Sequence, residues 1–74
     1  MVLNMTDITI RDEFIKLGQA LKLGGLVESG VEAKIVIQNG EVKLNGEVEY
    51  QRGKKLRDGD IVSFHGEELK IHGN

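Results

Sequence analysis

A chain of 74 residues without a single cysteine has to fold around one small apolar core. Domains of this size bury little apolar surface, and many of them rely on disulfides or a bound metal for stability. The absence of cysteine excludes disulfides and thiolate zinc sites, and it fits a reducing compartment. We therefore expect residues 1–74 to form one domain.

The first part of the chain has the spacing of a strand followed by a helix. Residues 6–12 (TDITIRD) alternate between apolar and polar side chains, which predicts a short strand. Residues 17–21 place apolar side chains at i, i+3 and i+4, the spacing of a short amphipathic helix. Gly24-Gly25 is expected to end this helix.

A capping pattern predicts the start of a second helix. Ser29 and Glu32 form the S-x-x-E pattern of a capping box, in which Ser29 accepts from a helix amide and Glu32 reaches back to the cap. Apolar residues follow at helical spacing from Ala33, and Asn39-Gly40 supplies a left-handed stop. The pattern predicts a helix of about three turns.

A hairpin turn is predicted after this helix. Asn45-Gly46 is a residue pair typical of a two-residue turn, because both positions need positive φ. Such a turn places Val48 on the face of Lys43 rather than on the apolar face of the strand. We therefore expect the pairing to end soon after the turn and residues 51–55 to form a loop.

The remaining segments complete a small sheet. After a turn at Asp58-Gly59, residues 62–71 predict two strands joined by a tight turn. The order of elements predicts an α+β domain in which two short helices pack on a small, mostly antiparallel sheet. Phe14 and Phe64 are expected in the core, which leaves Tyr50 as the candidate for stacking on a base.

Charge is unevenly distributed along the chain. The formal net charge is −2, yet residues 34–57 contain six basic side chains and three acidic ones, giving +3 there and −5 elsewhere. Local charge decides where an anion docks, so this segment predicts a basic edge.

The cations of this segment could bind successive phosphates of a nucleic-acid backbone. Gly30, Lys34 and Gln38 share one stripe of the second helix, whose N-terminus attracts anions, and the loop 51–55 adds a basic cluster. Contact with four or five phosphates would give a log–log salt slope of roughly −3 to −4. The alternative is that these basic residues form an ordinary solvated surface without a binding role, because such a surface would have the same composition. The expected contact residues are Ser29, Lys34, Gln38, Lys43, Arg52, Lys54 and Lys55.

The stretch from Gly25 to Phe64 resembles the RNA-binding domain first defined in ribosomal small-subunit protein four, the alpha-L motif. The resemblance covers about forty residues and implies RNA binding through the capped helix and the basic loop. In order, the shared features are Gly-Leu-x-x-Ser at 25–29, an Ala-basic pair at 33–34, Gly-x-Val at 40–42, Asn-Gly at 45–46 and Gly-Asp-x-(apolar)-x-(apolar) at 59–64.

Segments 17–23 and 52–56 resemble the stand-alone bacterial YaaA/YbcJ-like branch of that family, whose members consist of this domain and little else. The core motif would then span residues 17–64. Gly30 and Lys34 stand where the family usually has arginine, and the proline that usually follows the Asn-Gly turn is missing. Neither residue reproduces a bidentate guanidinium–phosphate contact, so modest affinity is expected.

Other chemistries have little support. His65 and His72 are too few for a metal site, and no residue pattern indicates catalysis or a cofactor. No apolar run approaches the ~20 residues of a membrane span, and residues 1–14 lack the features of a signal peptide. We expect a cytoplasmic, monomeric, non-enzymatic protein whose partner is structured RNA, ribosomal or transfer RNA, on the ribosome or its precursor.

Two alternatives belong to other classes. Ubiquitin-like sulfur carriers end in Gly-Gly, whereas this chain ends in residues 72–74 (HGN), which disfavours that class. A module that docks on a protein or ribosome surface through Glu28 and Glu32 remains open. Binding that weakens steeply with salt would favour RNA, and salt-insensitive binding to a protein would favour docking.

Overall fold

The computed structural model describes residues 4–73. Residues 1–3, in the N-terminal segment discussed above, and Asn74 lie outside the described residues. The elements in chain order are β1 (Asn4–Thr9), β2 (Ile15–Lys16), α1 (Leu17–Leu23), α2 (Gly30–Gln38), β3 (Val42–Leu44), β4 (Glu47–Val48), β5 (Lys55–Leu56), β6 (Ile61–Phe64) and β7 (Glu67–His72).

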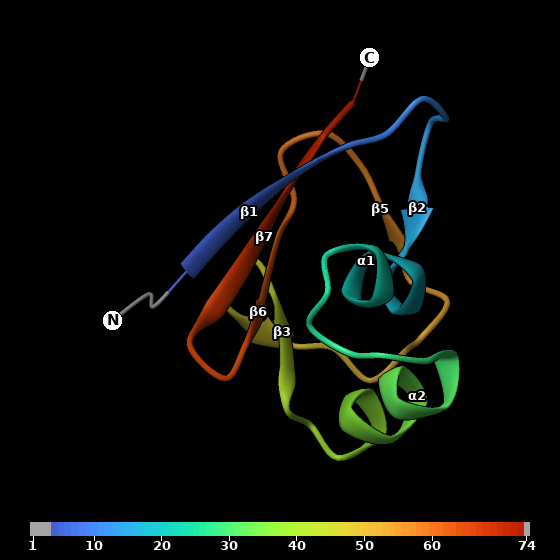
Figure 1. The fold of residues 1–74 in the computed structure, drawn as a ribbon, viewed down its shortest axis with the longest axis vertical. Coiled ribbons are helices and arrows are strands. Elements are labelled where there is room, and N and C mark those ends of the chain that lie inside the picture. Colours follow the sequence, from blue (N-terminus) through green and yellow to red (C-terminus); the bar gives the residue numbers. More distant parts are fainter. Residues whose placement is uncertain (1–3, 74) are drawn as a thin grey trace.

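Five strands form one sheet in the order β1-β7-β6-β3-β4 (Figure 1). β1 runs parallel to β7, with Ile8 opposite Ile71, and the other neighbouring pairs are antiparallel. The predicted α+β fold with two short helices and a mostly antiparallel sheet is confirmed. The parallel pair, which the local pattern does not indicate, joins the first strand to the last.

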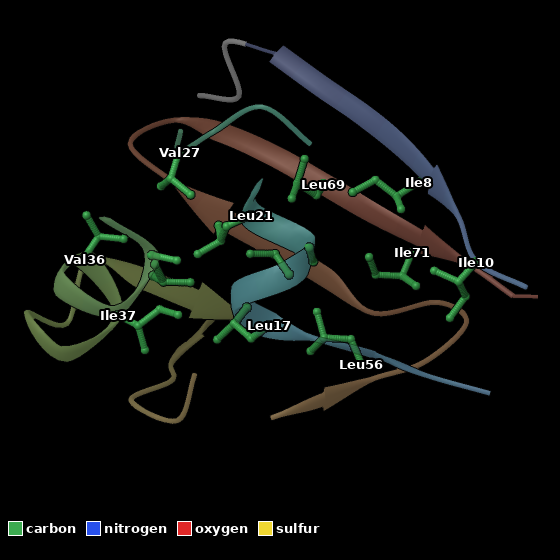
Figure 2. Packing of buried hydrophobic residues seen from close by; sticks show 14 residues of the cluster. Ile8, Ile10, Leu17, Leu21, Val27, Val36, Ile37, Leu56, Leu69 and Ile71 are labelled. Carbon is green, nitrogen blue, oxygen red and sulfur yellow. The ribbon is translucent and has the colours of Figure 1, made fainter. Parts of the chain in front are cut away.

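Both helices pack on the same face of the sheet and enclose the core (Figure 1; Figure 2). Val42, Val62 and Leu69 are completely buried on that face, and α1 contributes the equally buried Leu17 and Leu21. Burying one such side chain contributes about 1.5–3 kcal/mol. Helices of seven and nine residues are too short to be stable alone, so the shared core holds them in place.

A second sheet of two strands lies beside α1 (Figure 1). β2 pairs antiparallel with β5, with Ile15 opposite Leu56 and Lys16 opposite Lys55. The prediction that the loop extends to Lys55 is therefore wrong, because this residue lies in a strand. A strand of two residues is too short to show an alternating pattern in the sequence. In the structure Leu56 is completely buried, which stabilises the pairing.

The aromatic residues occupy three different environments. Phe64 is partly buried and packs against the core, as predicted. Phe14 is only half-buried and does not belong to the core cluster formed by residues 4–73, which corrects the prediction for it. It lies in the connection between β1 and β2, where no periodic pattern shows which way a side chain points. Tyr50 is 62% exposed.

The Asn-Gly turn has the predicted geometry. Asn45 and Gly46 have φ values of 52° and 88°, the left-handed values that this turn requires. β4 ends at Val48, which pairs with Lys43 and is 41% exposed. The expected early end of the hairpin is therefore confirmed.

Hydrogen bonds connect this turn to the Gly-Asp segment. Asn45 Nδ2 donates to Asp60 Oδ1 over 3.0 Å, and the Ile61 amide donates to Asn45 Oδ1 over 2.9 Å. The second carboxylate oxygen of Asp60 accepts from the Arg57 amide at 2.7 Å. The two motif segments are thus one hydrogen-bonded unit, which gives a physical reason for their joint occurrence.

The cap of α2 is confirmed with one change. Ser29 Oγ accepts from the Glu32 amide at 3.1 Å, as predicted. Glu32 Oε1, however, accepts from the amide of Glu28 at 2.7 Å rather than from that of Ser29. The reciprocal bond therefore lies one residue before the cap. At the other end of the helix Gly40 has a φ of 75°, the predicted left-handed stop.

Candidate nucleic-acid interface

The loop at residues 51–54 is docked on the start of α1. The Leu17 amide donates to the Lys54 carbonyl at 2.9 Å, and the Gly18 amide donates to the Arg52 carbonyl at 3.0 Å. A Cβ on Gly18 would lie 2.7 Å from Arg52 Cγ, so glycine permits the arginine stem to cross the helix closely. The loop carbonyls thereby satisfy two of the helix amides that have no partner within α1.

A hollow of about 370 Å³ opens beside this junction. We call it the basic hollow. Three of its described lining residues are cationic and none is acidic. It brings together α1, the loop and the first residue of α2, which are distant in sequence. The lining residues are Lys16, Gly18, Gln19, Lys22, Gly30, Arg52 and Gly53.

Two glycines keep the backbone accessible in the basic hollow. A Cβ on Gly30 or Gly53 would meet nothing within 4 Å. Gly30 is the first residue of α2, so the positive end of that helix faces the hollow. An anion there would meet side-chain cations and backbone amides together. Glu32, in the first turn of α2, partly offsets this positive potential.

The predicted contact residues do not all gather at this hollow. Arg52 lines it directly. Lys34 is exposed one turn along α2 from Gly30, about 6 Å along the axis, and Lys54 is exposed in the docked loop. These three cations lie on or beside the basic hollow, and their contact with RNA stays a prediction.

The other predicted residues are differently placed. Ser29 Oγ is engaged in the helix cap, and Gln38 lies about 12 Å along α2 from the hollow. Lys43 alternates with the buried Val42, so its side chain is on the sheet face opposite the helices. Lys55 Nζ lies 4.8 Å from the centroid of the Phe14 ring, where Arg57 Cζ also approaches to 5.8 Å.

Sequence reasoning missed two lysines of the basic hollow. Lys16 and Lys22 flank Gln19 at i−3 and i+3, so all three side chains belong to the exposed part of α1 and its N-terminal edge. The Gln19 Oε1 atom accepts from the Lys16 amide at 3.2 Å. The spacing was readable in the sequence, but only the docked loop shows that this surface adjoins Arg52.

Titratable pairs lie away from the basic hollow. His65 Nε2 is 2.6 Å from Glu41 Oε1, and His72 Nε2 is 2.7 Å from Asp7 Oδ1. The hydrogen bond from His65, with a second one from Asn39, holds the pKa of Glu41 below its ordinary value of 4.5. Within residues 4–73, no three His, Asp or Glu side chains are grouped so that they could hold a metal ion. Neither helix of that range has the length and apolar character needed to cross a membrane.

The fold and these motifs define the chain as a member of the S4 domain family. The family model described as "S4 domain" matches residues 8–72, from the last two residues of β1 to the end of β7. The resemblance to the domain of ribosomal small-subunit protein four, inferred from the sequence, is thereby confirmed. The match also extends the region of similarity on both sides of residues 25–64.

Relatives in two bacteria have closely similar sequences. The chain is 44% identical over 59 residues to "Probable ribosome maturation protein RlbA" of Bacillus subtilis (strain 168), covering 80% of this chain and 83% of that protein. It is 42% identical over 57 residues to YbcJ of Escherichia coli (strain K12), covering 77% and 81%. Both relatives therefore contain little beyond this domain.

The solution structure of E. coli YbcJ has the same fold. It superposes with a TM-score of 0.67 and 35% identity over the structural alignment, which covers 92% of this chain and 85% of YbcJ. That structure is described as revealing an alfaL motif involved in RNA-binding. The alpha-L fold inferred from the sequence is confirmed by this likeness.

Proposed function

We propose that this protein is a non-enzymatic, cytoplasmic RNA-binding protein that contacts the backbone of structured RNA through the basic hollow. The observation that carries the proposal is the meeting of three cations and an open helix N-terminus, with no carboxylate among the described lining residues. A phosphate backbone requires several positive groups at neighbouring positions, whatever the base sequence. Lys34 and Lys54, exposed beside the hollow, would extend the contact.

Arg52 would supply the guanidinium that α2 lacks. The resemblance places an arginine at the position of Gly30, directly after the cap serine. Arg52 and Gly30 line the same hollow here, so an arginine from the loop reaches the region that a helix arginine would occupy. Its stem is held over Gly18, which favours an ordered, bidentate contact with phosphate.

The relatives support a ribosomal target. RlbA is named for ribosome maturation, and the YbcJ structure is described in terms of RNA-binding. We extend these descriptions to this chain as a proposal, with ribosomal RNA or a ribosomal precursor as the first target and transfer RNA as the second. A monomer would suffice, because the basic hollow is built within one chain.

A fluorescence-anisotropy titration tests the proposal. Wild-type protein would be titrated with a structured ribosomal RNA fragment and with duplex DNA of equal length. We expect preference for RNA and a loss of affinity in Arg52→Ala. The matched control is Lys43→Ala, which removes one exposed cation from the opposite face of the sheet. Equal binding of RNA and DNA, or equal losses in the two variants, would count against the hollow as the site.

Docking on a protein remains a second candidate because of α2. Val31 and Ile35 are 69% and 53% exposed at i and i+4, so this helix shows an apolar stripe to solvent beside Glu28 and Glu32. Under this alternative, Val31→Ser/Ile35→Ser would abolish salt-insensitive binding to a ribosomal subunit. Under the RNA proposal the same variant would retain RNA affinity.

A further inference from the structure

A second, larger hollow adjoins the basic hollow along the exposed part of α1. It has a volume of about 760 Å³ and is formed by residues 9–12, 14 and 15 and the exposed part of α1. We call it the apolar groove, because Ile10, Phe14, Ile15 and Leu23 line it. Its polar lining includes one carboxylate, from Asp12 next to Arg11.

The apolar groove and the basic hollow share a border. Gln19 and Lys22 line both, so the side chains of α1 separate two adjoining sites of different character. The basic hollow has a cationic lining that suits phosphate. The apolar groove also contains Arg11, Asp12 and Lys22, but its aromatic and aliphatic side chains offer a surface that suits a flat uncharged group. In a nucleotide a charged phosphate and a flat, uncharged base are joined through one sugar. Two adjoining sites, one for each part, therefore match a nucleotide.

We propose that the apolar groove seats one unpaired base of the RNA whose backbone crosses the basic hollow. This inference rests on the proposed function and names the structural feature of the RNA that the protein selects. Phe14 supplies an aromatic ring for the base, and Leu23, which is 65% exposed, supplies apolar surface near it. A paired base could not enter, because its faces are covered by neighbouring bases.

Two cations hold the Phe14 ring. Lys55 Nζ and Arg57 Cζ lie 4.8 Å and 5.8 Å from its centroid; Lys55 is the first residue of β5, and Arg57 directly follows that strand. Cation–π attraction of this kind orders a half-buried ring before any ligand arrives. Lys55, predicted to contact RNA directly, would thus act mainly by positioning Phe14.

Gln19 adds the capacity to read the edge of a base. Its Oε1 atom accepts from the Lys16 amide, which orients the side-chain amide at the border of the two sites. The NH₂ group of that amide carries two hydrogen-bond donors. Base edges that offer acceptors would therefore bind better than edges that offer only donors.

The test compares two RNA hairpins that differ by one unpaired nucleotide. Wild-type protein is expected to bind the bulged hairpin about tenfold more tightly than the fully paired one, within the range typical of one base on one aromatic side chain. Phe14→Leu is expected to lose this preference and to keep its affinity for the paired hairpin. Because that affinity is measured on the same protein, it also reports whether the variant is folded.

An exposed residue gives a second variant with little risk to the fold. Leu23→Ser should weaken binding of the bulged hairpin only, whereas Met5→Ser, at a 49% exposed residue on β1, should change neither affinity. The fluorescence of 2-aminopurine at the unpaired position should change on binding to wild type and stay unchanged with Phe14→Leu.

The possible failures can be told apart. Equal affinity of wild type for both hairpins, with steep salt dependence, would overturn the base site and leave backbone binding standing. Equal losses on both hairpins in Phe14→Leu would likewise overturn it. Failure of wild type to bind either hairpin better than duplex DNA would overturn the proposed function together with this inference.

Discussion

Removing the two lysines of α1 should reduce both the affinity for RNA and its salt dependence. Lys16 and Lys22 are exposed and line the basic hollow. Each phosphate neutralised contributes about 0.7–0.9 to the magnitude of the log–log salt slope. The double variant Lys16→Ala/Lys22→Ala should therefore have a slope about 1.4–1.8 units less steep than wild type.

The same relation gives the loss of affinity. At about 0.1 M salt, two lost contacts correspond to about 1.4–1.8 logarithmic units, or a 25- to 60-fold weaker complex. Wild type, with contacts from the two lysines, Lys34, Arg52 and Lys54, should have a slope of about −3.5 to −4.5. Anisotropy titrations of one hairpin RNA at four salt concentrations would measure all of these values.

The control variant has the same change in net charge. Lys43→Ala/Lys70→Ala removes two cations from the sheet face opposite the helices, since each alternates with buried neighbours along its strand. Its slope should equal that of wild type within about half a unit. Equal changes in slope for the two double variants would show that net charge alone explains the binding, and that the basic hollow is not the contact site.

Three further predictions address positioning, stability and pH. Gly18→Ala places a Cβ 2.7 Å from Arg52 Cγ, so the arginine stem has to move and RNA affinity should fall several-fold in anisotropy titrations; unchanged affinity would contradict the role of Arg52. Asp60→Ala removes two hydrogen bonds and should cost about 1–2 kcal/mol in urea unfolding; a cost below about 0.5 kcal/mol would contradict the joined motif. The lowered pKa of Glu41 stabilises the fold above pH 4.5, and this contribution should disappear as pH falls through the folded-state pKa. NMR titration of His65→Ala should show the pKa of Glu41 returning toward 4.5.

Local features of the fold were predictable because they depend on neighbouring residues. The cap at Ser29, the left-handed stop at Gly40 and the turn at Asn45-Gly46 each follow from short-range hydrogen bonding or backbone freedom. The early end of β4 was also predictable, because a period of two fixes which face Val48 must occupy.

Contacts between distant segments were not predictable in this way. The parallel pairing of Ile8 with Ile71 joins residues far apart in sequence, and no local pattern specifies a partner strand. The same holds for the pairing of Ile15 with Leu56, which places Lys55 in a strand.

Only part of the candidate site was predicted, because the site also depends on contacts between distant segments. Charge composition indicated the basic loop, and the basic hollow includes Arg52 from it. α1 lines the hollow because its first two amides donate hydrogen bonds to the loop, and only the tertiary structure shows these bonds. The count of charges in residues 34–57 also included Lys43, whose side chain is on the sheet face opposite the helices and the basic hollow.

The most direct test of the basic hollow as the RNA-binding site is a map of amide chemical shifts in a ¹⁵N-labelled protein titrated with a hairpin RNA of ribosomal sequence. We expect the largest changes at Gly18, Gln19, Gly30 and Gly53, which line the basic hollow. Little change is expected along β3 and β7. Shifts confined to the sheet or to the apolar stripe of α2 at Val31 and Ile35, with the hollow unaffected, would contradict RNA binding at the basic hollow.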